Sequence, residues 1–146
     1  MRRYKLNKEI KLYCKKFGIK KVKLTDEFSY YPNKALVTYT IYASETDVEF
    51  IELVNQKYNV NIRPWYFIFC LLHEIGHHMT LNQLSKEDLE TDFLLRSMIP
   101  FFENQGKAYL GFTAEDLATS WAIEYIDSHL KECFEFQNKC IEIMKK

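Results

Sequence analysis

The stretch from Pro64 to Thr80 constrains the fold more than any other part of the sequence. Pro64 suits the first turn of a helix, because the N–H that proline lacks would have no partner there. No further proline follows before Thr80, and the run from Trp65 to Leu72 is apolar. We therefore expect a helix through this stretch that lies against the core.

Two histidines near the end of this predicted helix, His73 and His77, frame a His-Glu-x-x-His pattern. Residues four apart lie one turn above each other on the same face of a helix. Two imidazole nitrogens at that spacing can bind one zinc ion at about 2.0–2.1 Å. Glu74 lies beside the first ligand and can reach a metal-bound water without binding the metal itself. The pattern is typical of hydrolases in which a metal acidifies water and a carboxylate takes its proton.

A third metal ligand has to come from downstream, because a catalytic zinc ion usually has three protein ligands and keeps a fourth position for water. Glu115 falls in the first turn of a helix that we expect Thr113 to cap, where its charge also suits the helix dipole. Small residues on that helix would allow a close approach to the motif helix, and we expect Asp116 to cap the helix or orient a histidine ring. Spacing alone leaves four further acidic residues open as ligands: Glu87, Glu90, Asp92 and Glu124.

A glycine within the motif and the two other histidines of the chain are not expected to bind the metal. Gly76 costs about 1 kcal/mol relative to alanine inside a helix, so we expect another backbone to cross close to it. His78 points about 100° away from the histidine pair and is not expected to bind the metal. His129 stands alone and is expected to be an ordinary hydrogen-bonded residue.

The remaining pattern predicts one α+β domain over residues 1–146. A helix over 4–17, capped at Gly18, precedes strands over 19–24 and 34–42. We expect these strands to form a small antiparallel sheet at the N-terminus, packed against a helical bundle that carries the motif helix. Further helices are expected to begin after Ser44 and Ser85, each followed by an aspartate three residues later. The segment 103–111 is predicted to be a loop, and helical periodicity continues from there nearly to the C-terminus.

Two stretches together resemble the ImmA/IrrE-type metallopeptidases. The first is His-Glu-Ile-Gly-His-His from His73 to His78, and the second is Glu115-x-x-Ala118-x-x-Trp121-Ala122. The family has HE[LI]GH followed by a downstream E-x-x-A-N-x-[FW]-A helix. The chain departs from this pattern at Thr119, where the family usually has asparagine, and over 123–125. The resemblance implies a minimal zincin-like domain with His73, His77 and Glu115 as zinc ligands and Glu74 as the catalytic base.

The resemblance also implies a function and a class of partner. Members of the family are often encoded by phages and mobile elements, where they cleave or antagonise a helix-turn-helix repressor. We therefore expect a zinc-dependent metallopeptidase that hydrolyses peptide bonds, with such a repressor as a candidate substrate. The chain shows no DNA-binding module of its own, so no direct binding of nucleic acid is expected.

Several mechanistic alternatives stay open at this point. A metal-containing regulatory module could act by docking on a partner without hydrolysis, and replacing Glu74 would separate the two functions. A helical interaction protein with an accidental motif would bind no metal. Tyr109 and Tyr125 are both candidates for stabilising an oxyanion. The strand over 34–42 could pair with an extended substrate.

Composition and charge bear on the cellular context. The longest apolar run is far shorter than the roughly 20 residues that span a bilayer, so no membrane association is expected. The four cysteines lack CxxC spacing and are expected to be reduced thiols, which favours the cytoplasm. Up to Lys34 the chain has eleven basic and three acidic residues, a net charge of +8, and the rest has a net charge of −8. This asymmetry predicts either a docking surface or a solvated face.

Overall fold

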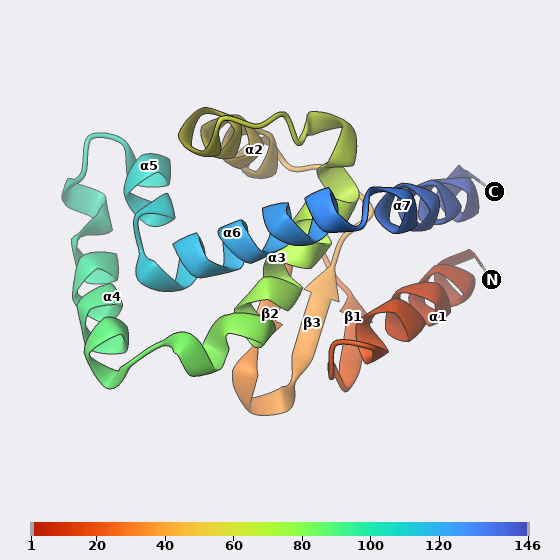
Figure 1. The fold of residues 1–146 in the computed structure, drawn as a ribbon, viewed down its shortest axis with the longest axis horizontal. Helices are drawn as coiled ribbons and strands as arrows, with labels where there is room; N and C mark the ends of the chain where they lie inside the picture. Colours follow the sequence, from red (N-terminus) through yellow and green to blue (C-terminus); the bar gives the residue numbers. More distant parts are fainter. Residues whose placement is uncertain (1, 146) are drawn as a thin grey trace.

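The computed structural model describes residues 2–145 of the 146-residue chain, which adopt an α+β fold. A small three-stranded sheet near the N-terminus packs against the helices, as the sequence predicts (Figure 1). Within residues 2–145 no helix has the length and apolar character needed to cross a membrane. The helices are α1 (Arg2–Lys15), α2 (Glu45–Tyr58), α3 (Tyr66–Thr80), α4 (Lys86–Met98), α5 (Gln105–Leu110), α6 (Thr113–Ser128) and α7 (Leu130–Lys145), and the strands are β1 (Lys21–Leu24), β2 (Ser29–Tyr31) and β3 (Leu36–Tyr39).

The sheet is mixed, and the expectation of a purely antiparallel sheet is wrong. Its strand order is β1-β3-β2, with β3 parallel to β1 and antiparallel to β2. The unpredicted strand β2 forms a hairpin with β3 through a 3₁₀ turn (Pro32–Lys34) that ends at Ala35, where φ is 46°. Because β2 reverses the chain, β3 returns in the direction of β1.

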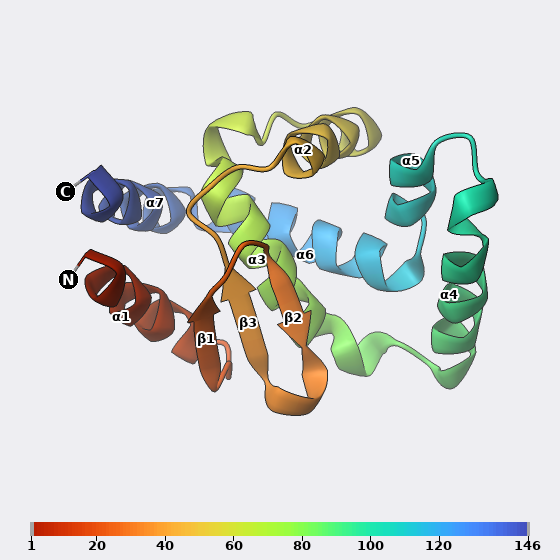
Figure 2. The same ribbon diagram turned by 180° about the vertical axis from the view of Figure 1, so that it is seen from behind.

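Strand β3 is the central strand of this sheet (Figure 2). Both of its edges are therefore occupied by hydrogen bonds to β1 and β2. A substrate segment cannot add to β3 as a further strand, so this expectation is wrong. The free edges of the sheet belong to β1 and β2.

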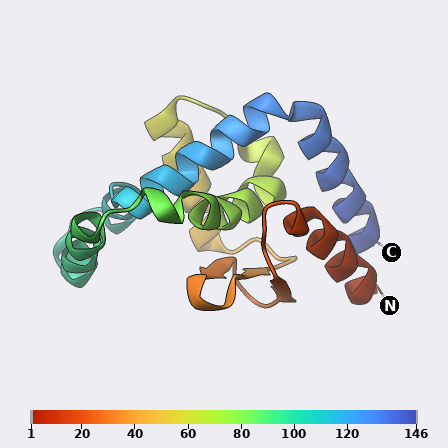
Figure 3. The same cartoon turned by 60° about the horizontal axis from the view of Figure 1, so that its bottom comes forward.

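Helix α3 lies in the middle of the fold, between the sheet and α6 (Figure 3). Each residue of α3 from Phe67 to Gly76 is buried, as the apolar approach to the motif predicts. The motif histidines follow directly after this apolar stretch on the same helix. They are therefore held on the most deeply buried element of the fold.

Local capping signals behave as expected at two helix starts. The Ser44 hydroxyl accepts a hydrogen bond from the Asp47 N–H at 3.1 Å, and α2 begins at the next residue. Ser85 and Asp88 form a complete capping box at the start of α4. Each interaction satisfies backbone donors that the first helical turn leaves without partners.

The segment 103–111 is not a loop, because it contains the short helix α5. Asn104 starts this helix, and its side chain accepts a hydrogen bond from the Lys107 N–H at 2.9 Å. At the far end of the molecule, α1 and α7 lie side by side (Figure 1). The four cysteines are free and buried, and two of them, Cys133 and Cys140, pack into the core from α7.

Candidate metal centre

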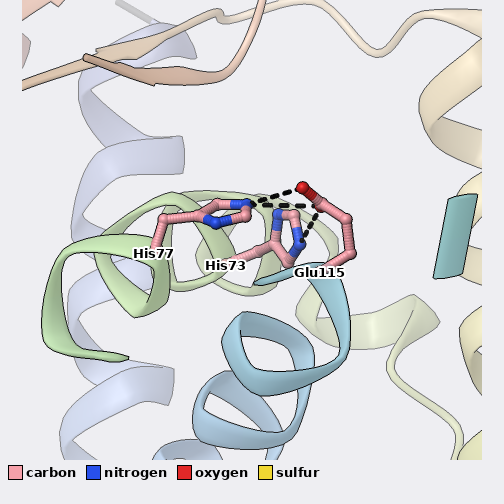
Figure 4. A group of neighbouring side chains, drawn as sticks. All are labelled: His73, His77 and Glu115. Atoms are coloured by element: carbon pink, nitrogen blue, oxygen red, sulfur yellow. Dashed lines mark hydrogen bonds and ion pairs between the residues drawn. The ribbon is translucent and has the colours of Figure 1, made fainter. Parts of the chain in front are cut away.

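The two motif histidines lie one turn apart on α3, as the sequence predicts. The ring centroids of His73 and His77 are 4.8 Å apart, with an interplanar angle of 76°. His73 is buried, with 5% of its surface exposed, whereas His77 is partly open to solvent. In this arrangement the Nε2 atoms of both rings face a common point beside the helix, where His77 Nε2 lies 3.2 Å from a carboxylate oxygen of Glu115 (Figure 4).

Glu115 supplies a third side chain to that point from the first turn of α6 (Figure 4). Its Oε1 atom lies 3.1 Å from His73 Nε2, and its Oε2 atom lies 3.2 Å from His77 Nε2. One ligand atom from each of the three residues lies within 4.8 Å of the others. Among the residues that the structure describes, the other acidic candidates do not join this cluster, and Glu87, Glu90 and Glu124 are exposed.

These distances fit a metal ion bound by all three residues. Two ligands that each lie about 2.05 Å from a tetrahedral ion are separated by about 3.3 Å. One oxygen of Glu115, Oε1, lies 3.1 Å from His73 Nε2 and 3.2 Å from His77 Nε2, and both separations are close to that value. A pair of imidazole nitrogens and a carboxylate is also the donor set that zinc accepts, although other divalent ions share it.

The environment of His73 Nε2 also fits a bound cation. This nitrogen is buried and has no hydrogen-bond partner within residues 2–145. Glu115 Oε1 is near it, but the two atoms are not aligned as donor and acceptor. A buried polar atom without a partner costs free energy, and a bound metal ion would remove that cost.

The electrostatics of the cluster suit a cation. Burial lowers the pKa of His73, but the neighbouring carboxylates of Glu74 and Glu115 outweigh it and raise the pKa above its usual value. Burial raises the pKa of Glu115, but the adjacent His73 and His77 outweigh it and hold the pKa well below the usual range. Glu115 is therefore an ionised carboxylate held in the interior, which requires a positive partner.

Asp92 is not part of the metal cluster, but it holds the start of α6 in place. Its buried carboxylate accepts hydrogen bonds from the backbone N–H groups of Thr113 and Ala114, each at 3.0 Å. The residue before α6 is Phe112, and no side chain at that position caps the helix. The expected cap by Thr113 is therefore wrong, because a carboxylate from α4 takes the role. Asp92 thus fixes the turn that carries Glu115.

Arg96 lies one turn after Asp92 on α4 and contacts Glu115 directly. Its Nη2 atom lies 3.4 Å from Glu115 Oε2, and its guanidinium lies over the rings of Tyr109 and Phe112. Arg96 is not among the site residues expected from the sequence. Arg96 follows Asp92 by four residues, so both lie on one face of the helix. This spacing was the feature of the sequence that could have placed Arg96 beside Asp92 near the site.

Asp116, next to Glu115 on α6, has a different role from the one expected. Its carboxylate accepts a hydrogen bond from the Tyr58 hydroxyl and lies 3.6 Å from Lys57 Nζ. These contacts tie α6 to α2. Asp116 neither caps its own helix through its side chain nor contacts a histidine ring, so both expectations for it are wrong.

Glu74 lies beside the cluster at the wall of a cavity of about 460 Å³. Its Oε2 atom accepts a hydrogen bond from His73 Nδ1 at 2.8 Å, which fixes the orientation of that ring. Its Oε1 atom has no hydrogen-bond partner among the described residues. One carboxylate oxygen is therefore available to a molecule in the cavity.

Tyr109 and Tyr125, which the sequence left as equal candidates, lie in different places. Tyr109 lines the cavity together with His73 and Glu74. Burial raises the pKa of Tyr109, and the charges of Glu115 and Glu74 raise it further, so its hydroxyl keeps its proton. Tyr125 stacks on Trp121 and donates to Glu132 at 2.9 Å, away from the cavity.

The remaining two histidines lie outside the cluster, as predicted. His78 Nδ1 is 2.7 Å from the Tyr30 hydroxyl, so this ring ties α3 to β2. His129 Nδ1 donates to the Tyr125 carbonyl at 2.9 Å.

Comparison of the chain with protein-family models, curated proteins and solved structures gives no match.

Proposed function

We propose that this protein is a zinc-dependent metallopeptidase whose ion is held by His73, His77 and Glu115. The observation that carries the proposal is the convergence of three ligand atoms beside a cavity lined by Glu74, whose Oε1 atom has no hydrogen-bond partner among the described residues. When bound, zinc would polarise the scissile carbonyl and lower the pKa of water. The sequence resemblance to ImmA/IrrE-type metallopeptidases, which implies the same ligands, supports the assignment.

Glu74 is the general base in this proposal. Its free Oε1 atom faces no competing donor among the described residues, so it can accept a proton from the attacking water. The same carboxylate can then return that proton to the leaving amine. Its other oxygen holds His73 Nδ1, so the residue that moves the proton also orients a ligand.

Tyr109 and Arg96 complete the proposed site. The Tyr109 hydroxyl is protonated and lines the cavity, so it can donate a hydrogen bond to the oxyanion that forms from the scissile carbonyl. Arg96 contacts Glu115 and lies over the Tyr109 ring, at 5.5 Å from its centroid. Its role is to position both side chains.

The substrate class in this proposal is a protein or peptide, and a helix-turn-helix repressor is the candidate that the resemblance suggests. We place the protein in the cytoplasm, because its four cysteines are free thiols. The runner-up function is a metal-containing regulatory module that binds such a repressor without cutting it.

Replacing Glu74 by glutamine tests the proposal, because the amide cannot accept the proton but has nearly the same size. The zinc-loaded Glu74→Gln protein should keep its metal and lose peptide hydrolysis by about 10²- to 10⁴-fold. Cleavage would be followed by mass spectrometry of a peptide mixture and of a repressor. If wild type and Glu74→Gln relieve repression equally and neither cuts any peptide, the docking function is correct and the peptidase proposal is wrong.

A further inference from the structure

The cavity next to Glu74 has the volume and the lining to hold a long side chain. It has a volume of about 460 Å³ and opens between α2, α3 and α5. Aromatic and aliphatic side chains form most of its wall, so it can hold an apolar chain segment. The apolar residues that line it are Phe28, Phe50, Leu53, Cys70, Ile99 and Tyr109.

The charged groups of the same cavity are all acidic apart from the His73 ring. Asp47 and Glu49 on α2 line it together with Glu74, and its lining contains no lysine or arginine. Neither Asp47 nor Glu49 forms an ion pair with another residue in the described part of the chain. Charges of one sign beside low-dielectric walls create a field that attracts the opposite charge.

Cys70 on the cavity wall shows how close these charges lie to the apolar interior. Burial raises the pKa of the Cys70 thiol, and the carboxylates of Asp47 and Glu74 raise it further. The two carboxylates therefore act on the same buried part of the wall from different helices, α2 and α3. A positive group placed there would interact with both.

We infer that the cavity selects a lysine or arginine side chain of the substrate, at the residue next to the bond that is cut. The statement about the bond rests on the proposed peptidase function. The aliphatic stem of such a side chain would lie against Phe28, Phe50 and Leu53, and its cationic end would reach Asp47. An acidic side chain is repelled by the same three carboxylates.

The α5 wall of the cavity packs closely against α2 at Gly106. A Cβ atom at Gly106 would lie 2.6 Å from Leu53 Cδ1, and both residues line the cavity. A larger side chain at position 106 would push the Leu53 side chain aside and narrow the cavity. A substitution at Gly106 therefore changes the size of the cavity without changing its charge.

The first experiment is cleavage of a diverse peptide mixture by zinc-loaded protein, with the cut sites identified by mass spectrometry. Lysine and arginine should be enriched next to the cut by about tenfold or more over norleucine-sized apolar residues, since a hydrogen-bonded ion pair commonly contributes that much. Asp47→Asn should reduce the enrichment, and Asp47→Lys should abolish it. Equal cleavage beside glutamate and lysine would overturn the inference.

Glu45→Lys is the matched control, because Glu45 is exposed in the same first turn of α2 but does not line the cavity. It changes the charge of the protein and of the helix end by the same amount as Asp47→Lys. It should leave the preference for basic residues intact. Loss of the preference in both variants would mean that general charge, and not the cavity, produces it.

A binding experiment separates this inference from the proposed function. Nα-Acetyl-lysine N-methylamide, which keeps its charged ε-amino group, and its norleucine and glutamate counterparts would be titrated into the Glu74→Gln protein, and the amide signals of Phe50 and Cys70 would be followed by NMR. The lysine probe should bind about tenfold more tightly than the norleucine probe, and Asp47→Asn and Gly106→Val should each weaken it.

Selective binding of the lysine probe by Glu74→Gln, together with a zinc-loaded wild type that cuts no peptide, would support the cavity and contradict the peptidase proposal. Tighter binding of the norleucine or glutamate probe would overturn the inference, whatever the activity. Thermal denaturation of each variant would show that it is folded.

Discussion

The backbone of Ala118 lies directly against Gly76. A Cβ atom added at Gly76 would stand 2.6 Å from the Ala118 carbonyl oxygen and 3.1 Å from its Cα atom. Glycine at this position therefore lets α6 approach α3 closely enough for Glu115, one turn before Ala118 on α6, to reach both histidines. The expectation that a second backbone crosses the motif at its glycine is confirmed.

Gly76→Ala should separate the two helices and weaken the metal centre. The atoms that meet the new methyl group are backbone atoms, which cannot rotate away, and such overpacking costs about 1–3 kcal/mol. Urea denaturation should show a lower free energy of unfolding, even though alanine is the better helix former. Gly106→Ala is the control, because its methyl group meets side-chain atoms alone, the flexible end of Leu53 and, at an ordinary contact distance, Asn104 Oδ1. Equal stabilities of the two variants would contradict this role for Gly76.

Asp92→Ala should loosen the first turn of α6. The change removes both hydrogen bonds to the N–H groups of Thr113 and Ala114 and should lower the free energy of unfolding by about 1–3 kcal/mol. Zinc affinity, measured by competition with a chelator, should fall as well because Glu115 lies in that turn. Glu90→Ala on the exposed side of α4 is the control and should change neither quantity. An unchanged zinc affinity in Asp92→Ala would show that the cap does not position Glu115.

Tyr109→Phe should lower kcat of peptide hydrolysis by about 10²- to 10³-fold without releasing the metal, because it removes one donor to the oxyanion. Tyr125→Phe provides the comparison, since its hydroxyl contacts Glu132 outside the cavity. That variant should hydrolyse peptides at the wild-type rate. A larger loss of kcat in Tyr125→Phe would reverse the assignment of the two residues.

The buried thiols predict a loss of stability in alkaline solution. Burial raises the pKa of Cys14 and of Cys140 to about 12, from an ordinary value near 9. Because the folded chain holds these protons more tightly than the unfolded chain, their contribution is complete below pH 9 and is lost as the pH rises from 9 to 12. The free energy of unfolding should therefore be lower at pH 10.5 than at pH 8. Cys140→Ala removes one of these groups and should fall less steeply over that interval, and equal slopes would contradict the assignment.

The helix that carries the motif could be predicted from the sequence because its signals are local. Pro64 lies in the 3₁₀ turn (Arg63–Trp65) that directly precedes α3, and the rest of the apolar run and the spacing of His73 and His77 lie on α3 itself. Ser44 and Ser85 likewise mark helix starts through contacts three residues away. The choice of Glu115 as the third ligand depended on the family resemblance as well. A carboxylate in the first turn also suits a helix that has no metal near it, so its position alone does not indicate a ligand.

The parts that could not be predicted depend on long-range contacts or on very short elements. Strand β2 has three residues, which are too few for an alternating pattern to be visible. Without β2, the sequence predicts that β3 runs antiparallel to β1, whereas the two strands are parallel. Helix α5 has only six residues, although Asn104 was a local signal for its start. Asp92 caps a helix that begins 21 residues later, so no local pattern indicates this role.

Zinc content of the purified protein, measured by mass spectrometry after zinc is supplied and excess is removed, tests the metal centre most directly. Wild type should hold one zinc ion per chain, and His73→Ala and Glu115→Ala should each lose it. His129→Ala should retain it, because that ring contacts the Tyr125 carbonyl away from the cluster. Wild-type protein that holds no stoichiometric metal, or a zinc content that survives both His73→Ala and Glu115→Ala, would contradict a metal centre formed by His73, His77 and Glu115.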